Sequence, residues 1–74
     1  MSTLPHVSGR KVVQALLKIG YDKDRQKGSH IVMRQISYPY RRIVVPDHKE
    51  VAKGTLRAII RHAGLTVEEF TKLL

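Results

Sequence analysis

Residues 27–34 are Lys27-Gly28-Ser29-His30-Ile31-Val32-Met33-Arg34, and this pattern predicts a tight turn followed by a β-strand. Gly28 suits the turn because a residue without a Cβ adopts positive φ at no steric cost. Polar and apolar residues then alternate with the period of two that a strand requires. The expected core pair is Ile31 and Met33. The opposite face of the strand carries His30, Val32 and Arg34.

His30 is the candidate reactive group of this segment. An imidazole is the side chain most often used for proton transfer near neutral pH. Here it begins a strand close to Lys27 and Arg34, beside a turn whose backbone N–H groups are available to an anion. The pattern indicates an anion site that carries a proton-transfer group. A single histidine beside a turn is also commonly no more than a surface residue, so residues 27–34 alone leave both interpretations open.

The composition points to a polyanionic partner. The chain has 74 residues, which we interpret as one domain spanning residues 1–74 with a small core. Its 14 Lys and Arg residues against 6 Asp and Glu residues give a formal net charge of +8. Such a surface attracts polyanions. We expect nucleic acid first, an acidic protein second and an anionic membrane surface third.

Several kinds of chemistry are disfavoured. The absence of cysteine removes disulfides, thiolate catalysis and cysteine-based zinc sites. Six scattered acidic residues offer no metal-ligand cluster, so we expect no metal and no small-molecule cofactor. No run approaches the roughly 20 apolar residues of a membrane span, and residues 1–7 lack the apolar segment of a signal peptide. We therefore expect a cytoplasmic protein that does not associate with membranes.

Two long helices and one short helix are predicted. Ser8 is a suitable N-cap for a helix over about residues 9–19, and a second helix is expected over residues 53–63. Thr66 and Glu69 form the capping-box pattern of a short last helix. Spacing on a helical period gives the residues expected to face the core: Val12, Val13, Leu16, Leu17, Leu56, Ile59, Ile60, Ala63, Phe70, Leu73 and Leu74.

Three strands are predicted between the long helices, over residues 21–26, 30–35 and 41–45. The first alternates poorly, yet it precedes a clear turn, so it should be the first arm of a hairpin with Tyr21 packed at its base. Pro39 interrupts the pattern and places a loop before the third strand. The predicted fold is α+β, in the order α-β-β-β-α plus a short C-terminal helix, with helices on one face of a three-stranded antiparallel sheet. Double-stranded-RNA-binding domains use this order.

Basic residues recur every four positions at Lys49, Lys53, Arg57 and Arg61. Like charges at this spacing destabilise an isolated helix by about 0.2–0.5 kcal/mol per pair. A solvated helix face is the usual explanation for such a run. Phosphate binding is the alternative, because Lys49 and Lys53 lie beside the positive end of the helix dipole.

Tyr38 and Tyr40 flank Pro39 in the expected loop. Aromatic rings in such a position stack on the bases of single-stranded RNA in some proteins. Two tyrosines around a proline more often pack only within their loop. The sequence leaves stacking as the less common alternative.

Three separated motifs stand out along the chain: Gly28-Ser29-His30 before an apolar strand, Val45-Pro46-Asp47-His48, and Gly54-Thr55-Leu56-Arg57-Ala58-Ile59-Ile60-Arg61 with Ala63-Gly64-Leu65. Together they resemble the HicA family of toxins. The likeness extends from about Ser8 to Leu74. It implies a double-stranded-RNA-binding-like fold and an mRNA interferase of a toxin-antitoxin pair, neutralised by an acidic HicB-type antitoxin.

The resemblance also implies site residues. The histidine of the Gly-Ser-His motif is His30, which would be the general acid or base of metal-independent RNA cleavage. His48 matches the Pro-x-His step without an assigned role, while His6 and His62 match no motif. RNA-binding residues are expected at Lys27, Gly28, Ser29, Arg34, Arg41, Arg42, Lys49 and Lys53. Four of these, Lys27, Arg34, Arg41 and Arg42, are candidates for stabilising charge in the transition state.

Two other interpretations stay open at this point. The chain could be a non-catalytic RNA-binding module of the same fold, in which His30 contacts a 2′-OH or a phosphate. It could instead be one half of a DNA-binding repressor complex, but its sequence shows no recognition-helix pattern of its own.

Overall fold

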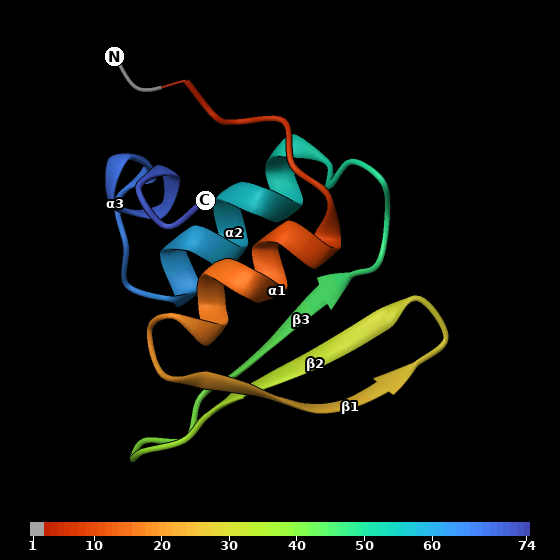
Figure 1. Cartoon of the computed structure of the whole chain (residues 1–74), viewed down its shortest axis with the longest axis vertical. Coiled ribbons are helices and arrows are strands. Elements are labelled where there is room, and N and C mark those ends of the chain that lie inside the picture. Colours follow the sequence, from red (N-terminus) through yellow and green to blue (C-terminus); the bar gives the residue numbers. More distant parts are fainter. Residues whose placement is uncertain (1–2) are drawn as a thin grey trace.

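The computed structural model describes residues 3–74 and shows an α+β fold in two layers (Figure 1). A helix precedes three consecutive strands, and two further helices follow them. The predicted order is therefore confirmed. The elements are α1 (Gly9–Leu17), β1 (Tyr21–Lys27), β2 (His30–Gln35), β3 (Arg42–Pro46), α2 (Lys53–His62) and α3 (Val67–Thr71).

The three strands form an antiparallel meander in the order β1-β2-β3. A two-residue turn joins β1 to β2, and Gly28 takes φ +59° at its first position, the conformation for which glycine was expected there. The register shifts between Lys23 and Arg25, which leaves Asp24 as a bulge. The strand alternates poorly in sequence because only Tyr21 of its seven residues is buried and the others are exposed. Each strand end lies within one residue of its predicted position.

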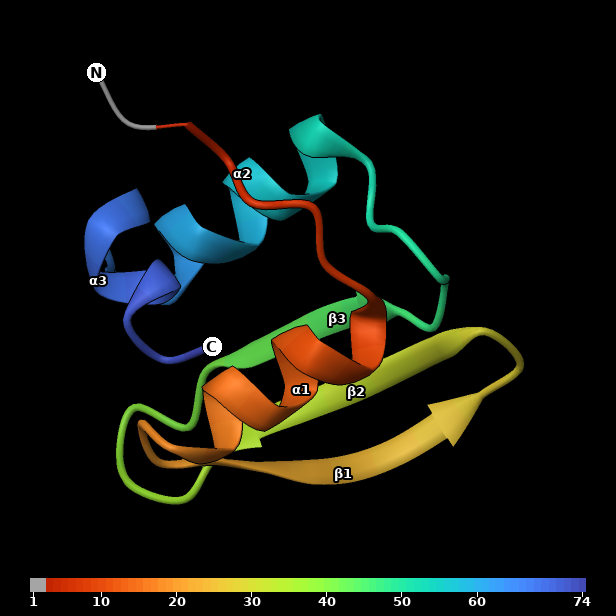
Figure 2. The same ribbon diagram turned by 45° about the horizontal axis from the view of Figure 1, so that its top comes forward.

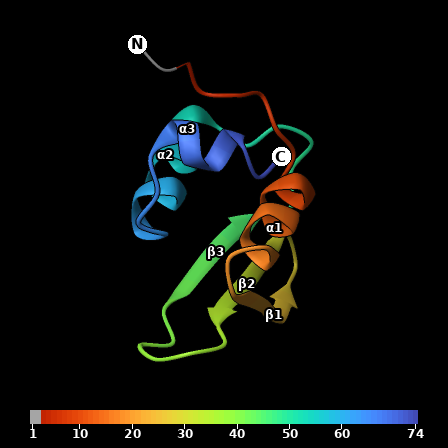
Figure 3. The same cartoon turned by 60° about the vertical axis from the view of Figure 1, so that its left-hand side comes forward.

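All three helices lie on the same side of the sheet (Figures 2 and 3). α1 packs over β1 and β3, α2 packs against β3, and α3 packs against α2. Ile31 and Met33 of β2 are buried beneath the helices, as the alternation predicted. No helix of residues 3–74 lies over the opposite face of the sheet, and the side chains of His30 and Arg34 are exposed there. The sheet therefore offers one open face.

α1 is shorter than predicted and buries a narrower stripe. The N–H groups of Lys18 and Ile19 donate to residues three positions earlier, at 3.1 Å each, so the last turn tightens and the α-helix ends at Leu17. Leu17 itself is 47% exposed, so its predicted place in the core was wrong. At 100° per residue it lies about 140° around the helix from the buried Val12.

The two ends of the described chain also differ from expectation. Leu4 and Val7 are not among the residues predicted to face the core, yet both are buried in it, and the carbonyl of Val7 accepts a hydrogen bond from the N–H of Val51 at 2.9 Å. The last helix has the predicted capping box and buries Phe70 completely. Leu74 lies beyond the end of α3 and is 45% exposed, so its inward orientation was also wrong.

None of the helices within residues 3–74 has the length and apolarity that a bilayer crossing requires.

Candidate active site

His30 is the first residue of β2 and is exposed on the open face of the sheet. Its register partners are Lys27 on β1 and Pro46 on β3. Directly paired residues of antiparallel strands point to the same face, with Cβ atoms about 4.5–5.5 Å apart. The ring of His30 therefore lies across from Lys27, with Arg25 on the same face of β1 opposite Val32, and it has solvent access on the open face.

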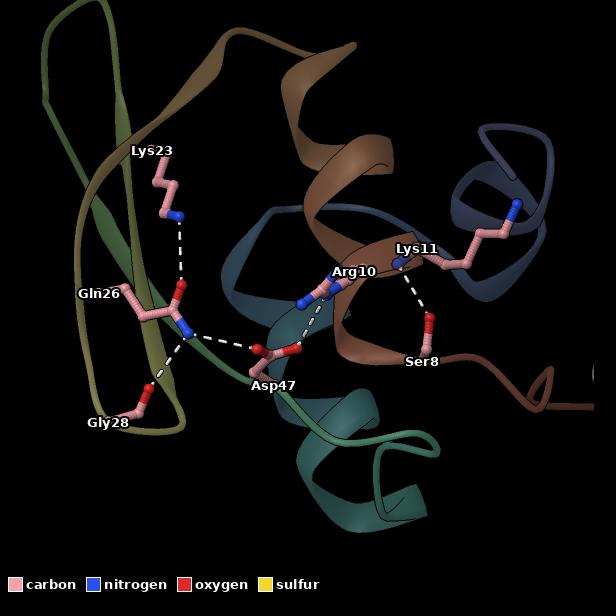
Figure 4. Close-up of polar contacts among 7 residues, drawn as sticks. All are labelled: Ser8, Arg10, Lys11, Lys23, Gln26, Gly28 and Asp47. Atoms are coloured by element: carbon pink, nitrogen blue, oxygen red, sulfur yellow. Dashed lines mark hydrogen bonds and ion pairs between the residues drawn. The ribbon is translucent and has the colours of Figure 1, made fainter.

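Polar contacts tie the turn before His30 to the loop after β3 (Figure 4). The N–H of Asp47 donates to the carbonyl oxygen of Ser29 at 2.6 Å. The amide Nε2 of Gln26 donates to the Gly28 carbonyl oxygen at 3.1 Å and to Oδ2 of Asp47 at 3.2 Å. Lys23 Nζ donates to Gln26 Oε1 at 3.1 Å. These contacts give both turn carbonyls, those of Gly28 and Ser29, a hydrogen-bond donor. Residues of β1 and of the loop after β3 therefore fix the position of His30.

The N-terminus of α1 completes this arrangement. Gly9 donates its N–H to the His48 carbonyl oxygen at 2.9 Å, and Arg10 Nε lies 3.5 Å from Oδ1 of Asp47. A Cβ at position 9 would overlap the Pro46 carbonyl oxygen and lie 2.9 Å from the carbonyl carbon. Only glycine allows this approach of the helix to the end of β3. Sequence reasoning missed these roles of Gly9, Arg10, Gln26 and Asp47, because no local pattern signals a contact between distant segments.

The predicted site residues fall into separate groups. Lys27, Gly28 and Ser29 surround His30 at one end of the sheet. Arg34 pairs with Arg42 at the other end, four residues along β2, which corresponds to about 13 Å at the usual strand rise. Arg41 immediately precedes β3 at that same end. Of the four expected charge stabilisers, only Lys27 is thus a register neighbour of His30.

The arginines at the far end have partners of their own. The Arg34 guanidinium carbon lies 5.4 Å from the centre of the Tyr40 ring, and Arg42 Nε lies 3.9 Å from Asp24 Oδ2. Arg41 and Arg42 also line a shallow hollow with Arg61 of α2. This end of the sheet is a positively charged surface at a distance from the histidine.

Lys49 and Lys53 lie beyond β3. Lys49 lines a hollow with Ser8 and Arg10 next to the start of α1. Lys53 is the first residue of α2, whose N-cap Ala52 makes no side-chain capping bond within residues 3–74. The predicted stripe Lys53, Arg57 and Arg61 is exposed along the helix layer. These charges extend the basic surface around the β3 edge, away from the open face that carries His30.

The other histidines take separate positions. His48 shares its hollow with Ser8 and Asp47, and its ring makes no hydrogen bond to any described residue. His6 Nδ1 lies 3.3 Å from a carboxylate oxygen of Glu50. His62 lies near the C-terminal end of α2 beside Arg41 and Arg42. No hydrogen bond within the described residues links His30 to a second acid or base.

Comparisons with known proteins show the family of the chain. A profile of the family described as HicA toxin of bacterial toxin-antitoxin matches residues 9–65. The chain belongs to the HicA toxin family. Among solved structures, a chain from a toxin-antitoxin complex of Streptococcus pneumoniae is similar, with 37% identity and a TM-score of 0.68. The match covers 80% of this chain and 98% of that one. No curated protein sequence matches.

The part of the chain that matches the HicA family contains the candidate site. The family match begins at Gly9, where α1 approaches Pro46, and includes the whole sheet. It ends at Leu65, before α3. The matched part therefore contains His30 and every contact described here that fixes its turn.

Proposed function

We propose that this HicA toxin is an endoribonuclease that cleaves messenger RNA in the cytoplasm, with His30 as its acid–base group. The observation that carries the proposal is the position of His30: it is exposed on the open face of the sheet, on a turn anchored from two sides, beside Lys27. A catalytic group needs this combination of access and fixed geometry.

Cleavage without a metal requires proton transfer and charge stabilisation. A base removes the proton of a 2′-OH, the 2′-oxygen attacks the neighbouring phosphorus, and the bond from phosphorus to the 5′-oxygen breaks. The departing 5′-oxygen takes up a proton from an acid. His30 supplies one of these two transfers, and the Lys27 ammonium stabilises the charge that develops on the phosphoryl oxygens. One acid–base group contributes about 10² to 10⁴ in rate, so we expect a slow nuclease.

The RNA-binding surface extends beyond these two residues. Gly28 and Ser29 present the turn backbone to the phosphate next to His30, while Arg34, Arg41 and Arg42 bind the strand further along the sheet. Lys49 and Lys53 continue the positive surface past the β3 edge. Because the net charge is +8, such binding is electrostatic and weakens as salt is added.

The antitoxin partner follows from the family and from the open face. The S. pneumoniae relative was solved as part of a toxin-antitoxin complex. On the open face, the half-buried Val32 pairs with Val44, which is 51% exposed, and basic side chains surround the two. An acidic antitoxin of the HicB type would match both the apolar centre and the charged rim. Bound there, it would cover His30.

The second candidate function is a non-catalytic RNA-binding module. It is favoured by one observation: within residues 3–74, no second acid–base group is hydrogen bonded to His30 or to Lys27. In that case His30 would contact RNA without transferring a proton.

Cleavage of a long single-stranded RNA in EDTA by the parent and by His30→Ala separates the two functions. For the nuclease we expect fragments with the parent, a loss of at least about 100-fold in rate with His30→Ala, and RNA affinity unchanged within a few-fold. His6→Ala is the matched control, because its histidine is also exposed but belongs to no motif. Intact RNA with the parent, together with weaker binding by His30→Ala, would establish the binding module instead.

A further inference from the structure

The loop between β2 and β3 displays two aromatic rings. Tyr38 is 85% exposed and Tyr40 is 48% exposed. Their ring centres lie 6.2 Å apart, with the ring planes at 87°. Packing within the loop accounts for the contact between the two rings, but it leaves most of the Tyr38 ring in solvent. An aromatic ring with free faces is the element on which unpaired bases stack.

Tyr40 adopts a backbone conformation that disfavours its own side chain. Its φ is +59°, and among residues 3–74 it is the only residue other than glycine with positive φ. Asparagine or glycine would fit this conformation with less strain. The loop conformation alone does not require an aromatic residue at position 40. The ring therefore indicates a function in binding at this position.

The neighbourhood of Tyr40 suits a base better than a phosphate. Arg34 lies over the Tyr40 ring at 5.4 Å from its centre. Both residues line a hollow of about 280 Å³, whose charged side chains are Asp22, Lys23, Asp24 and Arg34. Two carboxylates balance the two cations, so the hollow itself does not attract a phosphate. Its volume is close to the lower end of the range for small-ligand sites, about 300 Å³.

We infer that Tyr38 and Tyr40 form a stacking site for a base of single-stranded RNA. This inference rests on the proposed function and names its substrate as unpaired RNA. The site lies beyond the Arg34 end of β2, and Arg34 itself is about 13 Å along the strand from His30, so RNA bound along the sheet would place its base a few nucleotides from the cleaved bond. A duplex hides its bases in the helical stack and would not use the site.

Intrinsic fluorescence tests the stacking without requiring cleavage. The chain has three tyrosines and no tryptophan, and Tyr21 is buried at 2% exposure, so the accessible fluorophores are the two loop residues. The probe is a short 2′-O-methyl oligoadenylate, which has bases but no 2′-OH to attack. We expect saturable quenching by this probe. Inorganic polyphosphate and a duplex of the same 2′-O-methyl strand should bind by charge with little quenching. Equal quenching by all three ligands would overturn the inference.

Two substitutions extend the test to affinity. Tyr38→Ala removes the exposed ring, and Tyr40→Asn removes the second ring while keeping a residue compatible with positive φ. Each should weaken oligoadenylate binding by about 5- to 150-fold, the range that stacking on one ring supplies. Leu74→Ala, which truncates an exposed apolar residue outside the sheet, should have no effect. Unfolding curves confirm that each variant is folded.

The result separates this inference from the proposed cleavage. If the parent cleaves RNA, the tyrosine variants should raise KM with little change in kcat, whereas His30→Ala lowers kcat. If the parent does not cleave, quenching and affinity still decide the stacking. Tyrosine variants that bind the oligonucleotide as tightly as the parent would overturn the stacking site. If those variants also bind the antitoxin less tightly, the loop belongs to a protein interface instead.

Discussion

The N–H of Asp47 donates a hydrogen bond of 2.6 Å to the carbonyl oxygen of Ser29. This bond joins the loop after β3 to the residue directly before His30, and the Asp47 side chain adds contacts to Gln26 and Arg10. Three segments that are distant in sequence therefore meet at one carboxylate. We interpret Asp47 as a positioning residue that holds the turn in place for His30.

Substitution of Asp47 should weaken catalysis more than binding. Asp47→Ala keeps the backbone bond to Ser29 but removes both side-chain contacts, so we expect cleavage to slow by about 10-fold through misplacement of the turn. Asp47→Asn retains one acceptor oxygen and should show a smaller loss. The measurements are kcat, KM and hydrogen exchange of the amide at position 47, which donates to Ser29, with Glu68→Ala on α3 as a control for the change of charge. An amide at position 47 that exchanges as slowly in Asp47→Ala as in the parent would contradict this role.

Gly9→Ala should destabilise the fold although alanine is the better helix former. The new Cβ would overlap the Pro46 carbonyl oxygen, and the cost of such overpacking is typically about 1–3 kcal/mol. Gly54→Ala is the matched control, because a Cβ there meets no atom within 4 Å in the first turn of α2. We expect that change to stabilise the protein by up to about 1 kcal/mol. Urea unfolding of both variants measures the difference, and equal midpoints would show that α1 can move away from β3.

Lys27 should matter for cleavage more than an equally charged residue on the helix layer. Lys27→Ala and Arg57→Ala each remove one positive charge, but only Lys27 is the register partner of His30. We expect the first to lower kcat by about 10-fold or more, since it removes the cation nearest the reacting phosphate. The second should weaken RNA binding slightly and leave kcat unchanged. Similar kcat values for the two variants would place the stabilising charge elsewhere.

Tyr21 should make the fold sensitive to high pH. Burial raises the pKa of the Tyr21 phenol above its ordinary value, and the charge of Arg41 offsets part of that rise. The folded state therefore favours the neutral phenol. Its contribution to stability is complete below the unfolded pKa, near 10, and is lost as the pH rises through the higher folded pKa.

Tyr21→Phe tests this dependence. The Tyr21 hydroxyl is buried and has no hydrogen-bond partner among the described residues, so its removal should change stability at pH 7 by no more than about 1 kcal/mol. The variant should lose less stability than the parent between pH 9 and pH 11. Thermal unfolding across this range gives the comparison. Parallel losses in the two proteins would assign the alkaline transition to other groups.

Much of the fold was predictable because its signals are local. The alternation at Ile31 and Met33 predicted a strand and its buried face, and the spacing of Leu56, Ile59 and Ile60 predicted the core face of α2. Turn and capping residues marked element ends to within one or two positions. The predictions of burial were wrong where burial depends on packing between elements. Leu17 and Leu74 are apolar, but no other element among the described residues covers them. Three separated motifs in the right order, one of which contains His30, indicated the family.

The sequence by itself determined the elements, their order, the family and the position of His30 at the start of β2. These features depend on residue type and on spacing along a few turns or strand residues. Only the tertiary structure decided which charges accompany His30, because β2 places Arg34 at its far end and the sheet register brings Lys27 alongside. It also decided that Gly9 and Asp47 support the site. Both act through contacts between segments that are far apart in the chain, and such contacts exist only once the elements have packed.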